Sequence, residues 1–442
     1  MGRCAVSTQK QKRPFALRAL AAFAGTLAIL FVLLLAAYAL PGERVRQHVY
    51  DSARTIQNEG LYPEYLGFKL FQMDNYTDTL MLFEAASADE LPPLQAMMTN
   101  TAYNVDNFET LADDLAWYIE KDWSTGAQRT DAPALEPFSY ARYWHGYLIW
   151  LRPLLLLMPY TGVRIVQYIV LFALLAVGLV QLRRRCGLRA AVWFAVSQLA
   201  VSVWFVPHQV QYFTCFMIAY AGCVWVLAKP RRSDDVCLAL LVLGVVTSFC
   251  DLLVTPVLTL GLPLVCWLLE PQQRLRAGTR QCGIVVGGSL TWGVGYLLCW
   301  ASKWVLAGLV TGQNVIADAL HQVGVRTAAD SWHGMELTWG NILHFVYTTL
   351  AGKHLFWPLV LAVVLLLALF AASIRDRQQL ARALPLGLCA LMTPAWFIVL
   401  RTHSIQHGWF TWRALGLTVF AGLAFLYYCC DVRQIAKRLK RT

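Results

Sequence analysis

The sequence ALRALAAFAGTLAILFVLLLAAYAL, residues 16–40, decides the fold class. It is about 25 residues long, and its one charged residue, Arg18, lies close to its start. A helix of about 20 apolar residues is long enough to cross the hydrocarbon core of a bilayer. Because no small-residue cleavage site precedes Pro41, we interpret the segment as a retained membrane anchor rather than a removed signal peptide.

The rest of the chain has the composition of a membrane protein. Of its 442 residues, 58% are hydrophobic and 14% are charged, whereas soluble domains are rarely so apolar. Further spans are expected near residues 161–182, 188–206, 208–229, 235–252, 253–269, 283–307, 356–374, 383–400 and 411–429. The sequence therefore predicts an all-α, polytopic transmembrane helix bundle of about ten spans.

The net charge of +11 is explained by membrane topology. Basic residues gather between the predicted spans, for example at Arg183–Arg185, and in the tail from Arg433. Loops rich in Lys and Arg lie on the cytoplasmic side of a membrane. This distribution places both termini in the cytoplasm, in a cell membrane that we expect to be bacterial, and it argues against a nucleic-acid partner.

This topology divides the chain into five predicted regions. Residues 1–40 form the cytoplasmic N-terminus and the first span. The first loop, at 41–160, is extracytoplasmic and contains juxtamembrane helices. The other three regions are a transmembrane bundle at 161–307, a second extracytoplasmic loop at 308–355, and the last spans at 356–442 with an external loop at 401–413 and a basic cytoplasmic tail.

The segment Tyr143–Met158 of the first loop is apolar but short, and Arg152-Pro153 interrupts it. If this segment crossed the membrane, the basic residues at 183–185 would move to the outside. We therefore expect a re-entrant or interfacial helix, with its Trp and Tyr residues at the level of the lipid headgroups.

Two acids of the first loop, Asp74 and Asp78, lie four residues apart in MDNYTDTL, residues 73–80. On a helix, this spacing places both on one face. In one interpretation Asp74 only caps the helix that follows. In the other, Asp74 is a general base oriented by Asp78, beside an apolar run at Leu80–Phe83 that rests on the membrane surface. Partial desolvation there raises the pKa of an acid toward working pH. Glu43, just after the first span, is the competing candidate.

The external loop RTHSIQHGWFTWR, residues 401–413, is rich in basic and aromatic residues. Arg401, His403, His407 and Arg413 suit a phosphate or pyrophosphate headgroup. The aromatic residues suit a lipid or the face of a sugar, and anchoring at the interface is an alternative role for the whole loop. His403 and His407 have the spacing of a metal pair, but no third ligand is evident.

A second basic and aromatic cluster is RYWHGYLIWLRP, residues 142–153. Its Arg142, His145 and Arg152 are candidates for a further phosphate contact. The alternative is that these long side chains extend along apolar surface to reach the interface.

This layout resembles the GT-C superfamily of integral membrane glycosyltransferases. The shared features are an internal N-terminus, a long first external loop with juxtamembrane helices and acids, and about ten or more spans. The resemblance implies transfer of a sugar from a polyprenyl-phosphate donor to a hydroxyl of a glycan or lipid acceptor at the outer face, in cell-envelope glycan assembly. It implies that an acid of the first loop, Asp74, Asp78 or Glu43, is the base.

Two other classes of protein remain as alternatives. A transporter or flippase for lipids or lipid-linked glycans would use charged groups within its spans, where Asp251 is the main acid expected near membrane depth. A non-catalytic membrane scaffold would need no converging acids and bases. Membrane lipids are expected partners in each case. No cofactor is identified, and a divalent metal is left open.

Overall fold

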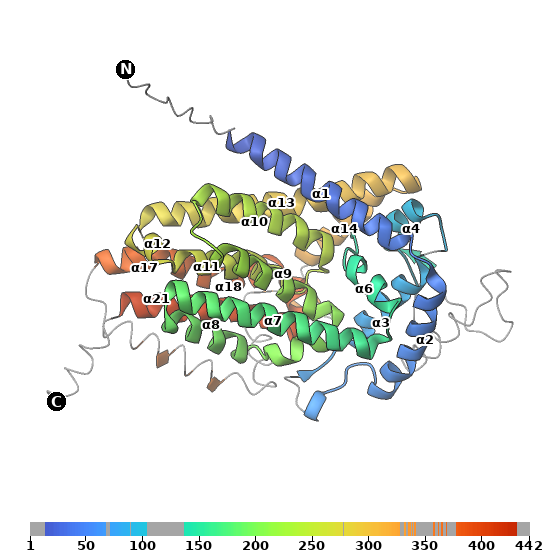
Figure 1. The fold of residues 1–442 in the computed structure, drawn as a ribbon, viewed down its shortest axis with the longest axis horizontal. Coiled ribbons are helices and arrows are strands. Elements are labelled where there is room, and N and C mark those ends of the chain that lie inside the picture. The colour runs from blue at the N-terminus through green and yellow to red at the C-terminus, as the bar shows by residue number, and fades with distance from the viewer. Residues whose placement is uncertain are drawn as a thin grey trace, which may run out of the picture.

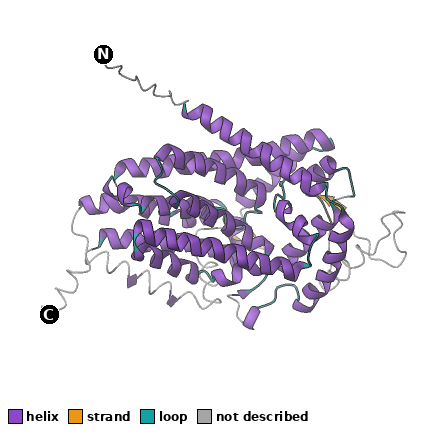
Figure 2. Ribbon diagram, in the orientation of Figure 1, coloured by secondary structure: helices purple, strands orange, loops and turns teal. Residues whose placement is uncertain are grey.

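The computed structural model describes residues 14–67, 71–88, 90–103, 137–276, 278–327 and 377–430, with a few residues between 331 and 368. These residues form a bundle of helices with two short antiparallel β-ribbons (Figures 1 and 2). The elements up to residue 200 are α1 (Phe15–Tyr38), α2 (Gly42–Glu59), η1 (Tyr65–Gly67), α3 (Asn75–Ser87), α4 (Pro93–Thr99), β1 (Thr101–Tyr103), β2 (Pro137–Ser139), α6 (Leu148–Leu155), α7 (Tyr160–Cys186) and α8 (Leu188–Ala200).

The later elements complete the bundle. They are η4 (Val203–His208), α9 (Val210–Leu227), α10 (Ser233–Cys250), α11 (Val257–Leu268), α12 (Pro271–Leu275), α13 (Thr279–Thr311), α14 (Val315–Thr327), β3 (Ser331–Trp332), β4 (Met335–Glu336), α17 (Arg377–Ala390), α18 (Met392–Val399), α19 (Arg401–Gln406), α20 (Gly408–Thr411), η5 (Trp412–Ala414) and α21 (Leu415–Cys429).

Within the described residues, seven helical segments are long and apolar enough to cross a membrane. They are α1, α7, α9, α10, α13, Gln378–Val399 and Gly408–Cys429. The expected count of about ten is not confirmed. The segments expected at 188–206 and 253–269 contain α8 and α11, which have 13 and 12 residues and are short for a bilayer. The segment expected at 356–374 lies mostly outside the described residues.

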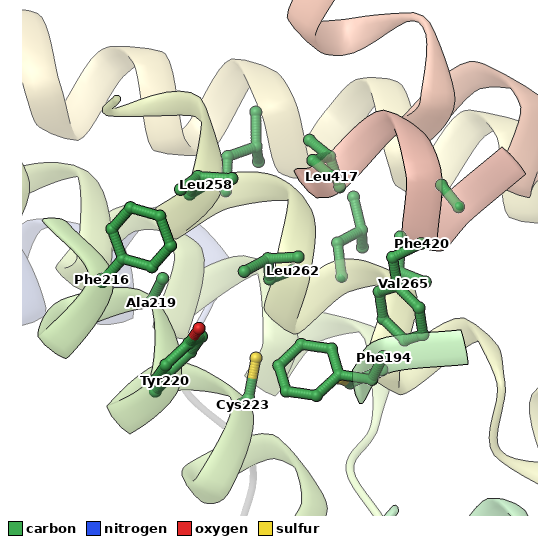
Figure 3. Packing of buried hydrophobic residues seen from close by; sticks show 14 of the residues in the cluster. Phe194, Phe216, Ala219, Tyr220, Cys223, Leu258, Leu262, Val265, Leu417 and Phe420 are labelled. Carbon is green, nitrogen blue, oxygen red and sulfur yellow. The ribbon is translucent and has the colours of Figure 1, made fainter. Parts of the chain in front are cut away.

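The centre of the bundle is built around α11, whose twelve residues are all buried. A helix that is apolar on every side belongs in an interior. Side chains from α8, α9 and α21 surround it, as the cluster with Phe194, Leu262 and Phe420 shows (Figure 3). Helices α10 and α13 pack closely because Gly295 has no side chain: a Cβ there would lie 2.3 Å from the carbonyl oxygen of Leu241.

The described helices of the first loop pack against the rest of the protein. Helix α3 contacts α2, α6, α9 and β1. Leu82 and Phe83 are fully buried, so the apolar run expected to rest on the membrane is covered by protein. The segment expected to be re-entrant or interfacial contains α6, a helix of eight residues that does not span and is packed under α1, α2 and α3.

The described basic segments converge at one end of the bundle, where α7 and α21 end and α17 begins (Figure 1). Arg185 pairs with Glu270 at 2.8 Å, and Arg274 donates to the carbonyl oxygen of Arg382 at 3.2 Å. The helices of the first loop lie at the opposite end. We call these the basic end and the α3 end.

Candidate functional site

A polar cavity of about 390 Å³ lies at the α3 end. Its wall comes from six parts of the chain: the segment between α2 and η1, α3 with its N-cap, the segment between β2 and α6, the start of α9, the segment between α10 and α11, and the helices α19 and α20. The lining residues are Tyr62, Asp74, Tyr76, Thr77, Leu80, Met81, Glu84, Tyr140, His145, Tyr147, Gln211, Leu252, His403, Gln406, His407, Trp409 and Phe410.

Asp74 is the N-cap of α3 and also lines the cavity. Its carboxylate accepts hydrogen bonds from the backbone N–H of Thr77 at 3.0 Å and from the Thr77 hydroxyl at 2.8 Å. Its own N–H donates to Oε1 of Gln209 at 2.6 Å. Burial raises the pKa of Asp74 to about 6, although the hydrogen bonds from Thr77 oppose the shift. Asp74 is therefore a cap and a group able to change charge near neutral pH.

The second acid in the cavity wall is Glu84, which our sequence reasoning did not select. One carboxylate oxygen lies 2.8 Å from Nδ1 of His145 and accepts a hydrogen bond from the Tyr147 hydroxyl. Glu84 is an acid inside the apolar run of α3, and this pattern is a sequence signal for a buried functional group. Its partners come from a segment sixty residues away and could not be read from the sequence.

His145 is held in an unusual backbone conformation at the cavity. Its φ of +54° lies in the left-handed region, where a non-glycine residue needs support from its surroundings. The support comes from the next residue: the N–H of Gly146 donates to the carbonyl oxygen of Phe249 at 2.8 Å, and a Cβ on Gly146 would lie 2.3 Å from the Phe249 ring. The ring of His145 is thereby placed between Glu84 and the carbonyl of Tyr140.

His403 and His407 reach the cavity from the C-terminal part of the chain. Both line it, and their ring centroids are 4.7 Å apart. Nε2 of His403 lies 2.9 Å from the carbonyl oxygen of Leu253, which can only accept, so this nitrogen is the donor. In the neutral ring the other nitrogen, Nδ1, is then an acceptor.

Aromatic rings complete the cavity wall. Trp409 meets Tyr62 edge to face with 5.3 Å between ring centroids, which joins the C-terminal helices to the first loop. Near Asp74, the side-chain oxygen of Gln211 is buried without a hydrogen-bond partner. A buried acceptor in this state is ready to bind a donor such as a hydroxyl group.

Two of the three acids chosen from the sequence lie outside the cavity lining. Asp78 is fully buried behind the wall and accepts hydrogen bonds from the N–H groups of Val210 and Gln211, each at 3.1 Å, and from the Tyr160 hydroxyl. It thus satisfies the first N–H groups of α9. Burial raises the pKa of Asp78 to about 7. Glu43 is exposed in the first turn of α2.

The four arginines chosen from the sequence do not line the cavity. Arg142 pairs with the exposed Asp318 at 3.3 Å. Arg152 is buried and donates to the carbonyl oxygens of Ala85 and Leu40. Arg413 is buried 4.6 Å above the Tyr212 ring, and Arg401 begins α19.

Within the described residues, no group of three or more His, Cys, Asp or Glu side chains is arranged to hold a metal ion. His403 and His407 remain a pair without a third ligand in this part of the chain. The metal requirement therefore stays an open part of the sequence-based expectation.

The seven apolar helices indicate a multi-pass helical membrane protein, and the cavity gives it a polar site at one end of the bundle. Comparisons with protein-family models, with curated proteins and with solved structures found no match to this chain.

Proposed function

We propose that the protein is a membrane glycosyltransferase that moves a sugar from a polyprenyl-phosphate donor to an acceptor hydroxyl at the outer face of the membrane. The observation that carries the proposal is the meeting of Asp74 with His403 and His407 in one cavity. Asp74 belongs to the first loop, whereas His403 and His407 lie near the C-terminal end of the sequence. A carboxylate and two imidazoles facing one space supply both a proton acceptor and donors for an anion.

The roles follow from the reaction. In inverting transfer, the acceptor oxygen attacks the sugar carbon as the bond from that carbon to the phosphate oxygen breaks. Asp74 takes the proton of the acceptor hydroxyl, because its raised pKa of about 6 makes it a base suited to neutral pH. His407 stabilises the negative charge that develops on the departing phosphate. His403 can add a hydrogen bond to the phosphate only when both of its ring nitrogens are protonated, because its Nε2 hydrogen is donated to the carbonyl oxygen of Leu253.

The wall also suits a sugar. Tyr62, Trp409 and Phe410 present aromatic surface, which packs against the apolar face of a sugar ring. The unpartnered oxygen of Gln211 can accept a bond from a sugar or acceptor hydroxyl. Glu84 holds His145 and Tyr147, so these three groups form a second polar contact surface opposite the C-terminal helices.

An apolar groove of about 850 Å³ offers room for a prenyl chain. It lies between α1, α7, α9 and α10, and its lining includes Leu174, Ile218 and Val242. Apolar walls of this kind favour the burial of a hydrocarbon tail.

The alternative is a flippase or transporter, and one observation bears on it. Lys303 is a buried cation within α13 that our sequence reasoning missed. Its ammonium group donates to the carbonyl oxygens of Met97 and Met98 and to Oδ1 of Asn100, at 2.6, 3.3 and 2.6 Å. All three acceptors belong to α4 or to its C-cap residue, Asn100, so the hydrogen bonds of Lys303 hold α13 against α4. This supports a structural role for Lys303 over a role in transport.

The test uses the full chain reconstituted in vesicles with radiolabelled polyprenyl-phosphate sugars and lipid or glycan acceptors. A glycosyltransferase forms labelled acceptor product and releases polyprenyl phosphate in equal amounts. Movement of the labelled donor between leaflets without product would support the flippase. Neither product nor movement, with every donor and acceptor class tried, would support the scaffold.

A further inference from the structure

A second cavity, of about 830 Å³, lies at the basic end. It is bounded by the junction of α7 and α8, by α12, by α17 and by the end of α21. Three arginines, Arg189, Arg274 and Arg382, line it together with the rings of Tyr427 and Tyr428. We call it the arginine pocket. It has no part in the chemistry proposed for the α3 end.

Two of the three guanidinium groups of the arginine pocket lie over aromatic rings. Arg274 lies 3.7 Å above the centroid of the Tyr428 ring, and its Nη1 donates to the carbonyl oxygen of Arg382 at 3.2 Å. Arg189 lies 5.1 Å above the Tyr427 ring and donates to the Tyr427 hydroxyl. Stacked guanidinium groups are fixed in direction, which suits them to bind the oxygens of a phosphate.

The described part of the pocket has more basic than acidic side chains. Among its described lining residues there is no Asp or Glu. The neighbouring acid, Glu270, is already paired with Arg185 at 2.8 Å. The buried Nε of Arg274 has no hydrogen-bond partner. Partial burial, with Arg382 adding to it, lowers the pKa of Arg274, as expected for a half-buried cation beside a like charge.

The pocket lies where lipid phosphates are expected. Two candidate spans, α7 and α21, end beside it at Cys186 and Cys429, and both Cys186 and Cys430 line it. Its rim also carries Leu275, whose side chain is 87% exposed. An exposed large apolar side chain next to guanidinium groups matches a ligand with an anionic head and an apolar tail.

We propose that the arginine pocket binds the phosphate headgroup of an anionic membrane lipid. Arg274 and Arg382 contact the phosphate oxygens, Arg189 adds a third positive charge, and the start of the acyl chain lies against Leu275. Basic residues at this end follow from membrane orientation alone. Three features indicate a binding site: the three arginines converge on one hollow, two of them lie over tyrosine rings, and the described lining residues include no acid.

The test measures binding of dioctanoyl phosphatidylglycerol and dioctanoyl phosphatidylcholine to the full chain in a neutral detergent, by the shift in melting temperature with lipid concentration. We expect the anionic lipid to bind about tenfold tighter or more. The double variant Arg274→Gln/Arg382→Gln should lose this preference, because each lost charge-assisted contact weakens binding by about tenfold or more. The matched control, Arg183→Gln/Arg276→Gln, removes two exposed charges outside the pocket and should keep the preference.

Several results would overturn the proposal. One is equal affinity for the two lipids, and another is an equal loss in the control pair, which would indicate a diffuse charge effect. Displacement of the anionic lipid by inorganic phosphate at the same concentration would assign the pocket to a soluble anion. If the double variant does not keep its helical circular dichroism, the single variant Arg382→Gln decides, because Arg382 is exposed and its loss leaves the core intact.

Discussion

Two groups of charged or ionisable side chains lie side by side at the α3 end, and they differ in whether they line the cavity. The cavity-wall groups are Asp74, Glu84, His145, His403 and the half-buried His407. The supporting layer behind it consists of Asp78, Arg152, Arg164 and Arg413. The cavity-wall groups line the open space of the cavity, although some of them also hydrogen-bond to the backbone. The supporting-layer groups do not line the cavity, and they hydrogen-bond to the backbone of neighbouring elements.

The difference shows that burial of a charge does not by itself identify a reactive group. Asp78 satisfies the first N–H groups of α9, and Arg164 donates to the carbonyl oxygen of His208 at 2.9 Å while pairing with Glu59. A group whose bonding capacity is used by the backbone holds helices together. Substitutions in the cavity wall should therefore change turnover, and substitutions in the supporting layer should change stability.

The largest effect is expected from Asp74→Asn. Asparagine keeps the cap of α3 and removes the base, so turnover should fall roughly 10²–10⁴-fold without a lower melting temperature. Asp74→Ala should also lose about 0.5–2 kcal/mol of stability. Transfer from labelled donor measures turnover, with the exposed Asp51→Asn as a control from the same loop. Normal turnover in Asp74→Asn would move the role to Glu84 or Glu43.

The next effect concerns the supporting layer. Asp78→Ala leaves the N–H groups of Val210 and Gln211 without their acceptor, at about 1–3 kcal/mol for each buried group, whereas the Tyr160 hydroxyl can still donate to the carbonyl oxygen of His208. Asp78→Asn keeps one acceptor oxygen and should lose less. Thermal unfolding measures both, and turnover per folded molecule should be unchanged. Lost turnover at a normal melting temperature would place Asp78 in the reaction.

A smaller effect distinguishes the imidazoles from Arg413. Removing one charge-assisted phosphate contact weakens binding by about tenfold or more, so His407→Ala should raise KM for the donor by that factor. Arg413→Ala should lower the melting temperature and leave KM unchanged, because Arg413 is buried against Tyr212. If neither His403→Ala nor His407→Ala changes the kinetics, the 401–413 helices serve as an anchor.

The pH dependence tests the state of Asp74. With a pKa of about 6, the base is ionised at neutral pH, and turnover should fall by about tenfold per pH unit below that value. The folded pKa lies above the ordinary value of 3.8, so the folded protein binds more protons between these values and stability falls as pH rises from 3.8 to about 6. Asp78 titrates as well, so the difference in stability between the wild type and Asp74→Asn isolates Asp74. No difference across this range would contradict the assignment.

The smallest effect is expected at Glu43. This acid is exposed on α2 and lies outside the cavity lining. Glu43→Gln should keep normal turnover and change stability by less than about 0.5 kcal/mol. A large loss of turnover would indicate that Glu43, at the end of the first span, is the base and that Asp74 is not.

The sequence by itself determined the features that depend on neighbouring residues. Apolar length predicted membrane helices such as α1 and α7, because the length and the apolar composition of a helix depend only on its own residues. The cap at Asp74 was predicted in the same way, since a cap bonds to the N–H groups of the next turn. The sequence predicted membrane spans where the shorter helices α8 and α11 lie, because apolar composition alone does not distinguish an interior helix from a span.

The tertiary structure alone decided which of the candidate groups meet. Asp74 and His403 share a cavity because α3 and α19 lie at the same end of the bundle. Asp78, one turn from Asp74, faces α9 instead and is used by its backbone. Glu84 finds His145 through a backbone conformation that Phe249 holds in place. Each of these contacts joins segments far apart in the chain, and their proximity is set by how whole helices pack, which no local pattern of residues encodes.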